Sequence, residues 1–134
     1  MLVSTKGRYA IRALVDMAEH SSESPVSLGD IASRQEISLK YMESIARELV
    51  NAGLIEGFRG KSGGYKLSKS PEKITILEVL SVTEKTVSPV YCIDSCSPGC
   101  ARKADCRSFP MWNELGGLIE DYFKDKSIKD LMKN

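Results

Sequence analysis

The chain has 134 residues, of which 42% are hydrophobic and 28% are charged, so it is long enough for one small domain with a packed core. Its net charge of +1 identifies no partner. No run approaches the roughly 18 apolar residues that a membrane span needs, and the start of the chain lacks the apolar stretch of a secretory signal. We therefore expect a cytoplasmic protein with no membrane association.

Helical periodicity dominates the beginning of the chain. Apolar residues at helical spacing predict a first helix over residues 9–18. After a polar gap, Ser27 is placed to cap a second, short helix that ends near Gln35, and Asp30 has the position of the returning acid in a capping box.

A third helix follows after a tight turn. Ser38 is placed to cap it, and its apolar stripe stops at Gly53, a typical helix-ending residue. Two short helices joined by a tight turn are typical of a helix-turn-helix.

The pattern beyond Gly53 changes from helix to strand. Two short strand-like runs, residues 54–58 and 64–67, flank a basic loop that contains glycine, which predicts a β-hairpin. A helix-turn-helix followed by a hairpin is a winged helix. Thr75 and Glu78 then have capping-box spacing at the start of another helix that runs to about Val82.

The rest of the chain divides into a cysteine-rich connection and a long helix. Residues 84–109 show no sustained periodicity, and Pro110 suits the first turn of a helix. The apolar residues that repeat at helical spacing after it are Trp112, Leu115, Leu118, Ile119, Tyr122 and Phe123. We expect a mainly α protein with a small β-hairpin (α+β). Its parts are a winged helix-turn-helix DNA-binding domain (1–82), a cysteine-rich cluster-binding loop (83–109), and a dimerisation helix with a C-terminal tail (110–134).

The expected recognition helix carries polar side chains at its N-terminal end. Ser38, Lys40 and Tyr41 can bind DNA phosphates, and Glu43 can accept a hydrogen bond from the amino group of cytosine. Arg59 in the wing suits a narrow minor groove. The alternatives are a winged helix that binds proteins, a Tyr41 that belongs partly to the core, and a Glu43 that is only a surface residue.

All four cysteines lie within fifteen residues, at positions 92, 96, 100 and 106. Such crowding favours a ligand cluster or a redox site over structural disulfides. Thiolates suit iron–sulfur clusters, zinc and copper(I). The spacing is not that of a zinc ribbon, but zinc held by four thiolates and a metal-free loop with reversible disulfides both stay open.

Three segments resemble a known family. Residues 4–10 (Ser-Thr-Lys-Gly-Arg-Tyr-Ala), 37–43 (Ile-Ser-Leu-Lys-Tyr-Met-Glu) and 59–65 (Arg-Gly-Lys-Ser-Gly-Gly-Tyr) look like the IscR/NsrR/CymR group of bacterial transcription regulators, the Rrf2 family. The resemblance covers nearly the whole chain, including the ending at residues 127–131. It implies a homodimer that binds a palindromic double-stranded DNA operator, with the long C-terminal helix at the dimer interface.

The same resemblance implies site residues. In the family, the residues that match Ser38, Lys40, Tyr41 and Glu43 lie at the major groove, and the one that matches Arg59 lies at the minor groove. Lys61, Gly63 and Gly64 belong to the same wing motif. Family members often have Ser at the position of Lys40, so the base preference does not transfer.

The cysteine spacing resembles the nitric-oxide-sensing branch of the family. Seven residues separate Cys92 from Cys100 and five separate Cys100 from Cys106, which implies a [2Fe–2S] or [4Fe–4S] cluster on these three thiolates. The family's two known fourth ligands are absent, because Phe109 replaces the His of one branch and Arg8 replaces the Asp of another. Cys96 is additional, and it is either the fourth ligand or a free redox thiol. The only histidine, His20, is interpreted as a surface residue.

These observations lead to one functional hypothesis and its alternative. The hypothesis is a DNA-binding transcriptional repressor whose cluster senses nitric oxide, redox state or iron–sulfur status. The alternative is a cluster-free or zinc-stabilised winged-helix regulator of cysteine or sulfur metabolism, controlled by thiol redox or by a protein partner. We expect no enzyme, because the chain has no candidate triad and its Gly60–Gly64 segment lacks the strand-to-helix context of a nucleotide loop.

Overall fold

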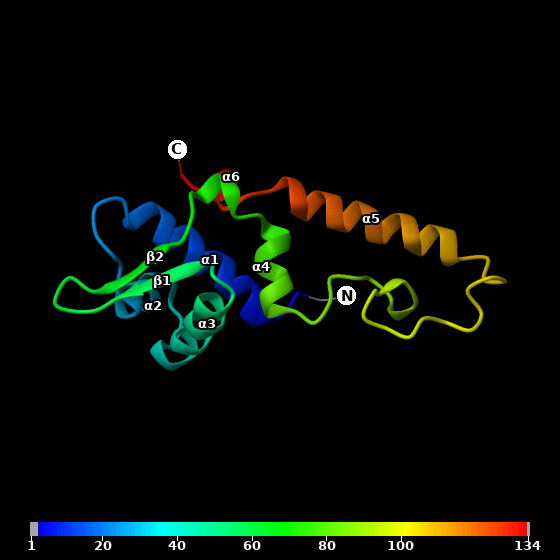
Figure 1. Ribbon diagram of the computed structural model, residues 1–134, viewed down its shortest axis with the longest axis horizontal. Helices are drawn as coiled ribbons and strands as arrows, with labels where there is room; N and C mark the ends of the chain where they lie inside the picture. The colour runs from blue at the N-terminus through cyan, green and yellow to red at the C-terminus, as the bar shows by residue number, and fades with distance from the viewer. Residues whose placement is uncertain (1–2, 134) are drawn as a thin grey trace.

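The computed structural model describes residues 3–133, and Figure 1 shows their arrangement. This part of the chain holds a two-stranded antiparallel sheet and helices that precede and follow it. The elements are α1 (Thr5–His20), α2 (Leu28–Gln35), α3 (Leu39–Asn51), β1 (Ile55–Phe58), β2 (Gly64–Leu67), the 3-10 turn η1 (Pro71–Lys73), α4 (Ile76–Thr83), the 3-10 turn η2 (Tyr91–Ile93), α5 (Phe109–Asp125) and α6 (Ile128–Leu131). The winged helix-turn-helix predicted from the sequence is confirmed.

The first helix begins four residues before the predicted one. Ser4 caps α1, since its hydroxyl accepts a hydrogen bond from the backbone N–H of Gly7 at 3.0 Å. Glu84, far away in the sequence, accepts two further hydrogen bonds from Ser4. Apolar periodicity alone did not indicate this start because the first turn is held by polar contacts.

The predicted serine caps of α2 and α3 are confirmed. The hydroxyl of Ser27 accepts from the N–H of Asp30 at 3.1 Å, and the hydroxyl of Ser38 accepts from the N–H of Tyr41 at 3.2 Å. The sequence also predicted a capping box, in which the Asp30 carboxylate accepts a hydrogen bond from the backbone N–H of Ser27. This prediction was wrong, because no hydrogen bond joins the Asp30 carboxylate to Ser27 within the described residues. Asp30 is exposed at this helix start, where its charge is favourable in any case.

The predicted cap of α4 is also only half formed. The Thr75 hydroxyl accepts from the N–H of Glu78 at 3.1 Å, as expected. The Glu78 carboxylate does not return to Thr75; it accepts from the ammonium of Lys69 at 2.8 Å. An ion pair with the segment before η1 thus replaces the second half of the capping box.

The wing is a short hairpin that is joined to the α1–α2 connection. Ile55 pairs with Leu67 at its base and Phe58 pairs with Gly64 near its tip. Val26 and Tyr65 exchange backbone hydrogen bonds of 2.8 and 2.9 Å, which extends the sheet beyond the hairpin. Gly64 has a φ of +145°, and a Cβ there would lie 2.5 Å from the carbonyl oxygen of Val26, so this junction requires glycine.

One hydrophobic core joins the helices of the winged helix with the C-terminal tail. Its largest fully buried side chains are Leu14, Met17, Ile31, Met42, Ile45, Leu49, Leu54, Ile55, Ile74, Val79, Leu80 and Ile128. Ile128 comes from α6 and is completely buried. Its N–H donates to the carbonyl of Ile74 at 2.9 Å, and the N–H of Ile76 donates to the carbonyl of Lys126 at 2.8 Å. The chain therefore returns to the core of the winged helix after α5.

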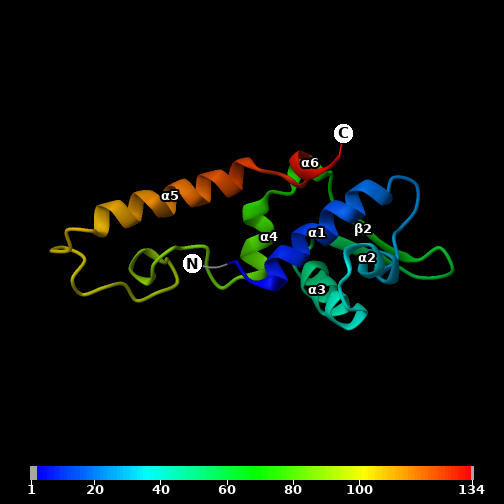
Figure 2. The same ribbon diagram turned by 180° about the vertical axis from the view of Figure 1, so that it is seen from behind.

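The molecule is elongated. Figures 1 and 2 show α1 to α4 and the hairpin at one end, while α5 extends away from them with the connection of residues 84–108 beside it. None of the helices formed by residues 3–133 combines the length and the apolarity needed to span a membrane.

Helix α5 has two apolar faces. The inner face includes Gly116, where a Cβ would lie 2.5 Å from the side chain of Ile93, so η2 packs closely against the helix. The outer face carries Leu118 and Tyr122, which are 60% and 61% exposed. No residue of α5 is fully buried within one chain.

Candidate functional site

One face of α3 is polar and exposed. Lys40, Glu43, Arg47 and Asn51 follow one another at intervals of three or four residues and therefore share this face. The opposite face holds the buried residues Met42, Ile45, Ala46 and Leu49. The core thus fixes the rotation of α3 and leaves the predicted recognition face free.

The N-terminal end of α3 is more constrained than its sequence suggests. The hydroxyl of Ser38 serves as the helix cap. Tyr41 is half-buried, and its ring meets that of Tyr9 edge-on with centroids 5.7 Å apart. The guanidinium of Arg12 lies 5.1 Å from the centroid of the Tyr9 ring. Tyr41 therefore belongs partly to the core, as one of the alternatives proposed.

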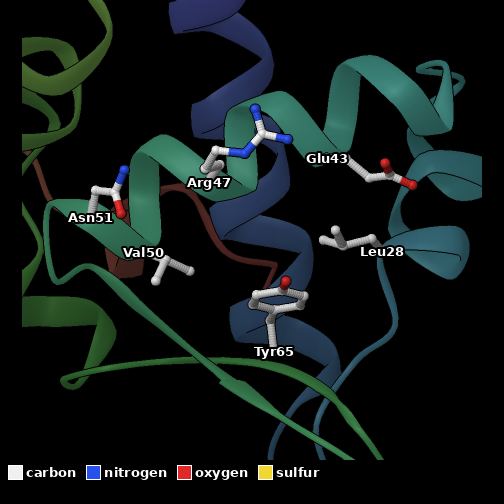
Figure 3. Close-up of a pocket in the computed structure, with 6 residues that line it drawn as sticks. All are labelled: Leu28, Glu43, Arg47, Val50, Asn51 and Tyr65. Atoms are coloured by element: carbon white, nitrogen blue, oxygen red, sulfur yellow. The ribbon is translucent and has the colours of Figure 1, made fainter.

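A groove of about 490 Å³ separates α3 from β2. Its lining residues, shown in Figure 3, are Leu28, Glu43, Arg47, Val50, Asn51 and Tyr65. Glu43 and Arg47 are one helical turn apart, yet they form no ion pair, and Arg47 pairs with no other carboxylate among residues 3–133. The groove thus has an acidic end near Leu28 and a basic side chain farther along α3.

The wing carries its predicted basic residues at an exposed tip. Arg59 and Lys61 lie between β1 and β2, in the loop that projects from the end of the molecule in Figure 1. Position 63 requires glycine, since a Cβ there would lie 2.6 Å from the carbonyl oxygen of Phe58. The predicted DNA-contacting residues therefore come from two separate elements, α3 and the wing loop.

A buried carboxylate joins α1 to α2. Asp16 is 2% exposed and accepts from the guanidinium of Arg34 at 2.7 and 2.9 Å and from the amide of Gln35 at 2.9 Å. Burial acts to raise the pKa of Asp16, but the hydrogen bonds from Arg34 and Gln35 outweigh it and hold this pKa below its ordinary value. The carboxylate is therefore ionised at neutral pH and holds α2, which precedes α3.

The four cysteines lie in one segment but are not gathered at one point. Cys96 and Cys100 are exposed, Cys92 and Cys106 are half-buried, and all four are free thiols. Among residues 3–133, no three His, Cys, Asp or Glu side chains are close enough together to hold a metal ion. Ser108 forms a hydrogen bond with Cys106, Sγ to Oγ 3.3 Å, which lowers the pKa of this thiol.

The residues at the family's fourth-ligand positions have other contacts. Phe109 begins α5, and the ammonium of Lys103 lies 4.9 Å from the centroid of its ring. Arg8 is exposed on α1 and donates to the hydroxyl of Thr5 at 3.2 Å. His20 lies at the exposed end of α1, with Nδ1 2.8 Å from the carbonyl oxygen of Asp16.

The beginning of the cysteine segment is attached to the first turn of α1. The carboxylate of Glu84 accepts from the N–H and hydroxyl of Ser4 at 2.8 and 2.7 Å. In the same turn, Lys6 donates to Glu48 of α3 at 2.9 Å, which raises the pKa of Lys6. One turn of α1 thus contacts both the cysteine segment and α3. Sequence reasoning missed this link because residues 4 and 84 are far apart in the chain.

Comparisons with known proteins agree over nearly the whole chain. The profile of a family described as "Rrf2: Iron-dependent Transcriptional regulator" matches residues 3–134. The chain is 36% identical to the HTH-type transcriptional regulator IscR of Aliivibrio salmonicida over 132 residues, which cover 98% of this chain and 77% of that protein.

Solved structures give the same result. CymR of B. subtilis, described as the global cysteine regulator of that organism, superposes with a TM-score of 0.81 at 30% identity, covering 98% of this chain and 95% of CymR. IscR of T. potens superposes with a TM-score of 0.75 at 31% identity, covering 98% of this chain and 85% of that one.

Proposed function

Because the chain belongs to the Rrf2 family of transcriptional regulators, which are not enzymes, we propose that it represses transcription as a homodimer whose operator affinity depends on an iron–sulfur cluster. The observation that carries this proposal is the grouping of four free thiols in the segment between α4 and α5. This segment connects the winged helix to the exposed helix α5. We place the protein in the cytoplasm, where thiols stay reduced.

The donor set fits the cluster. Cys92, Cys100 and Cys106 would hold it, and soft thiolates are the usual ligands of iron–sulfur clusters. The thiols are apart in the structure, so binding requires the segment to rearrange around the metal, as many small metal sites do. When bound, the cluster supplies a centre that reacts with nitric oxide or oxidants.

Cys96 is the proposed fourth ligand. It is the only remaining thiol, while Phe109 and Arg8 occupy the positions of the family's other fourth ligands and have no suitable donor atom. The side chain of Cys96 is exposed, so no packing opposes its movement toward the other three thiols.

The contacts of Glu84 suggest how the segment influences DNA binding. A rearrangement of the cysteine segment, which begins directly after α4, would move Glu84. Through the hydrogen bonds between Glu84 and Ser4, it would also move the first turn of α1. That turn also holds α3 through the Lys6–Glu48 ion pair. The state of the cysteine segment is thereby linked to the position of the recognition helix.

DNA recognition is assigned to two surfaces. We propose that Ser38, Lys40, Tyr41 and Glu43 meet the major groove and that the wing meets the minor groove with Arg59, supported by Lys61, Gly63 and Gly64. A homodimer would present two copies of both surfaces to the half-sites of a palindrome.

Glu43→Ala and Arg59→Ala test this assignment. Glu43→Ala should change sequence preference more than general affinity, because base contacts specify and phosphate contacts position. Arg59→Ala should weaken binding and reduce its salt dependence slightly. The measurement is selection of duplexes from a random-sequence pool, followed by titration. An unchanged preference in Glu43→Ala would remove α3 from its assigned role.

Metal analysis tests the cluster. The full-length protein is purified without oxygen, and iron, sulfide and zinc are assayed together with the visible spectrum. We expect broad visible absorption with matching iron and sulfide, lost in Cys100→Ala and reduced in Cys96→Ala, but unchanged in the neighbouring control Ser95→Ala. Colourless protein would contradict the cluster.

The alternative function is a cluster-free or zinc-stabilised regulator of cysteine or sulfur metabolism, controlled by thiol redox or a protein partner. The likeness to CymR of B. subtilis supports it. Colourless protein with stoichiometric zinc would favour the zinc-stabilised form, and colourless, metal-free protein would favour control by thiols or a partner.

A further inference from the structure

We infer that the groove between α3 and β2 binds a phosphate of the DNA backbone through Arg47, assisted by Asn51 and Tyr65. This inference rests on the proposed DNA-binding function and adds a contact beyond the residues already assigned. Arg47 lies on the same face of α3 as Lys40 and Glu43, seven residues after the first and four after the second. At 1.5 Å per residue, it is about 6 Å farther along the helix than Glu43.

The charge of Arg47 has no partner within the described chain. The other groove residues with a charge or polar group are Glu43, Asn51 and Tyr65, and Arg47 forms no ion pair with Glu43. By contrast, the exposed guanidinium of Arg34 is bound to Asp16. An exposed arginine without an internal partner, on the face that meets DNA, suits a phosphate oxygen.

The groove supplies further donors from two elements. Asn51 contributes an amide from the end of α3, and Tyr65 contributes a hydroxyl from β2 (Figure 3). The backbone of Tyr65 is fixed by its two hydrogen bonds with Val26, while its hydroxyl makes none to the described residues. The side chain of Tyr65 is partly buried against the hydrophobic core, and its hydroxyl is a free donor at the groove.

Glu43 determines which part of the groove accepts the phosphate. Its carboxylate repels a phosphate, so the anion belongs near Arg47 and Asn51 and not near Leu28. A base amino group, which is a donor, suits the Glu43 end. The same face of α3 thus reads a base at one turn and binds the backbone at the next.

Arg47→Ala tests the inference, with Arg47→Lys as the charge-keeping variant and Lys129→Ala as the control. Lys129 is an exposed cation on α6, on another side of the molecule from α3 (Figure 1). Each variant is titrated with a duplex selected from a random-sequence pool and with an unrelated duplex, at several salt concentrations. Circular dichroism checks that each variant is folded.

We expect Arg47→Ala to bind both duplexes about tenfold more weakly, because a charge-assisted hydrogen bond is lost. The slope of log affinity against log salt should fall by about 0.9 for each bound protomer. Tyr65→Phe should weaken both duplexes to a smaller extent. Arg47→Lys should recover most of the affinity, and Lys129→Ala should behave like the unmodified protein.

Two results would overturn this inference alone. The first is an Arg47→Ala variant with unchanged affinity and salt slope. The second is a changed sequence preference with an unchanged slope, which would make Arg47 a positioning residue for Glu43. If the unmodified protein bound neither duplex, the proposed function would fail together with this inference.

Discussion

At the scale of single residues, serine and threonine hydroxyls fix the starts of α2, α3 and α4. Ser27, Ser38 and Thr75 cap helices as predicted, because a hydroxyl and the N–H three residues later meet by local geometry alone. Asp30 and Glu78 do not complete capping boxes. Glu78 has a competing partner, Lys69, nine residues away, which spacing rules do not consider.

Asp16 carries a charge that the fold buries and pairs with Arg34. Asp16→Asn should lower the free energy of unfolding at neutral pH by about 1–3 kcal/mol, because it weakens charge-assisted hydrogen bonds at a buried group. Chemical denaturation measures the loss. The control is Glu78→Gln, at an ion pair whose two side chains are 38% and 37% exposed, where we expect less than about 1 kcal/mol.

The Asp16–Arg34 ion pair predicts that the free energy of unfolding depends on pH. The pKa of Asp16 is lowered from its usual 3.8, so its contribution is complete above that value and is lost as the pH falls through the lower pKa of the folded state. The difference in stability between the unmodified protein and Asp16→Asn should therefore shrink below about pH 3.8. A constant difference across this range would show that the variant acts by packing and not by charge.

At the scale of elements, the hydrophobic pattern predicted the winged helix because each of its helices has one clear apolar face. The pattern did not reveal the contacts of α6. A four-residue helix is too short to show periodicity, and its Ile128 donates a hydrogen bond to Ile74, more than fifty positions away in the chain. Arg47 was missed for a different reason, since a groove formed with β2 becomes visible only when both elements are folded. Its spacing from Lys40 and Glu43 was the available signal.

Ile128→Ala tests whether α6 belongs to the core. Ile128 is fully buried, so we expect the free energy of unfolding to fall by about 2–5 kcal/mol. The matched control is Lys129→Ala, since Lys129 is exposed on the same short helix. Equal free energies of unfolding for the two variants, measured by denaturant titration, would mean that the packing of α6 does not stabilise the fold.

At the scale of the whole molecule, α5 has an apolar outer face that the described chain leaves uncovered. Its inner face packs against α4 and η2, while Leu118 and Tyr122 on the outer face stay exposed. A symmetric partner would cover this outer face and place two winged helices on one operator. The elongated shape in Figures 1 and 2 leaves α5 accessible for this contact.

Leu118→Glu tests the proposed dimer. A charge on the outer face should convert a particle of twice 14.8 kDa into one of 14.8 kDa at micromolar concentration, as measured by sedimentation equilibrium. Asn113→Glu adds the same charge to a different, exposed side of α5 and should leave the mass unchanged. If both variants kept the mass of the unmodified protein, α5 would not be the interface.

We propose that the state of the cysteine segment sets operator affinity. The most direct measurement is an anaerobic titration of one selected operator with protein whose iron and sulfide have been assayed, before and after removal of the metal. We predict that the two affinities differ by a factor of about 5 to 150, the usual range of coupling between two sites. Equal affinities for loaded and metal-free protein would contradict the claim.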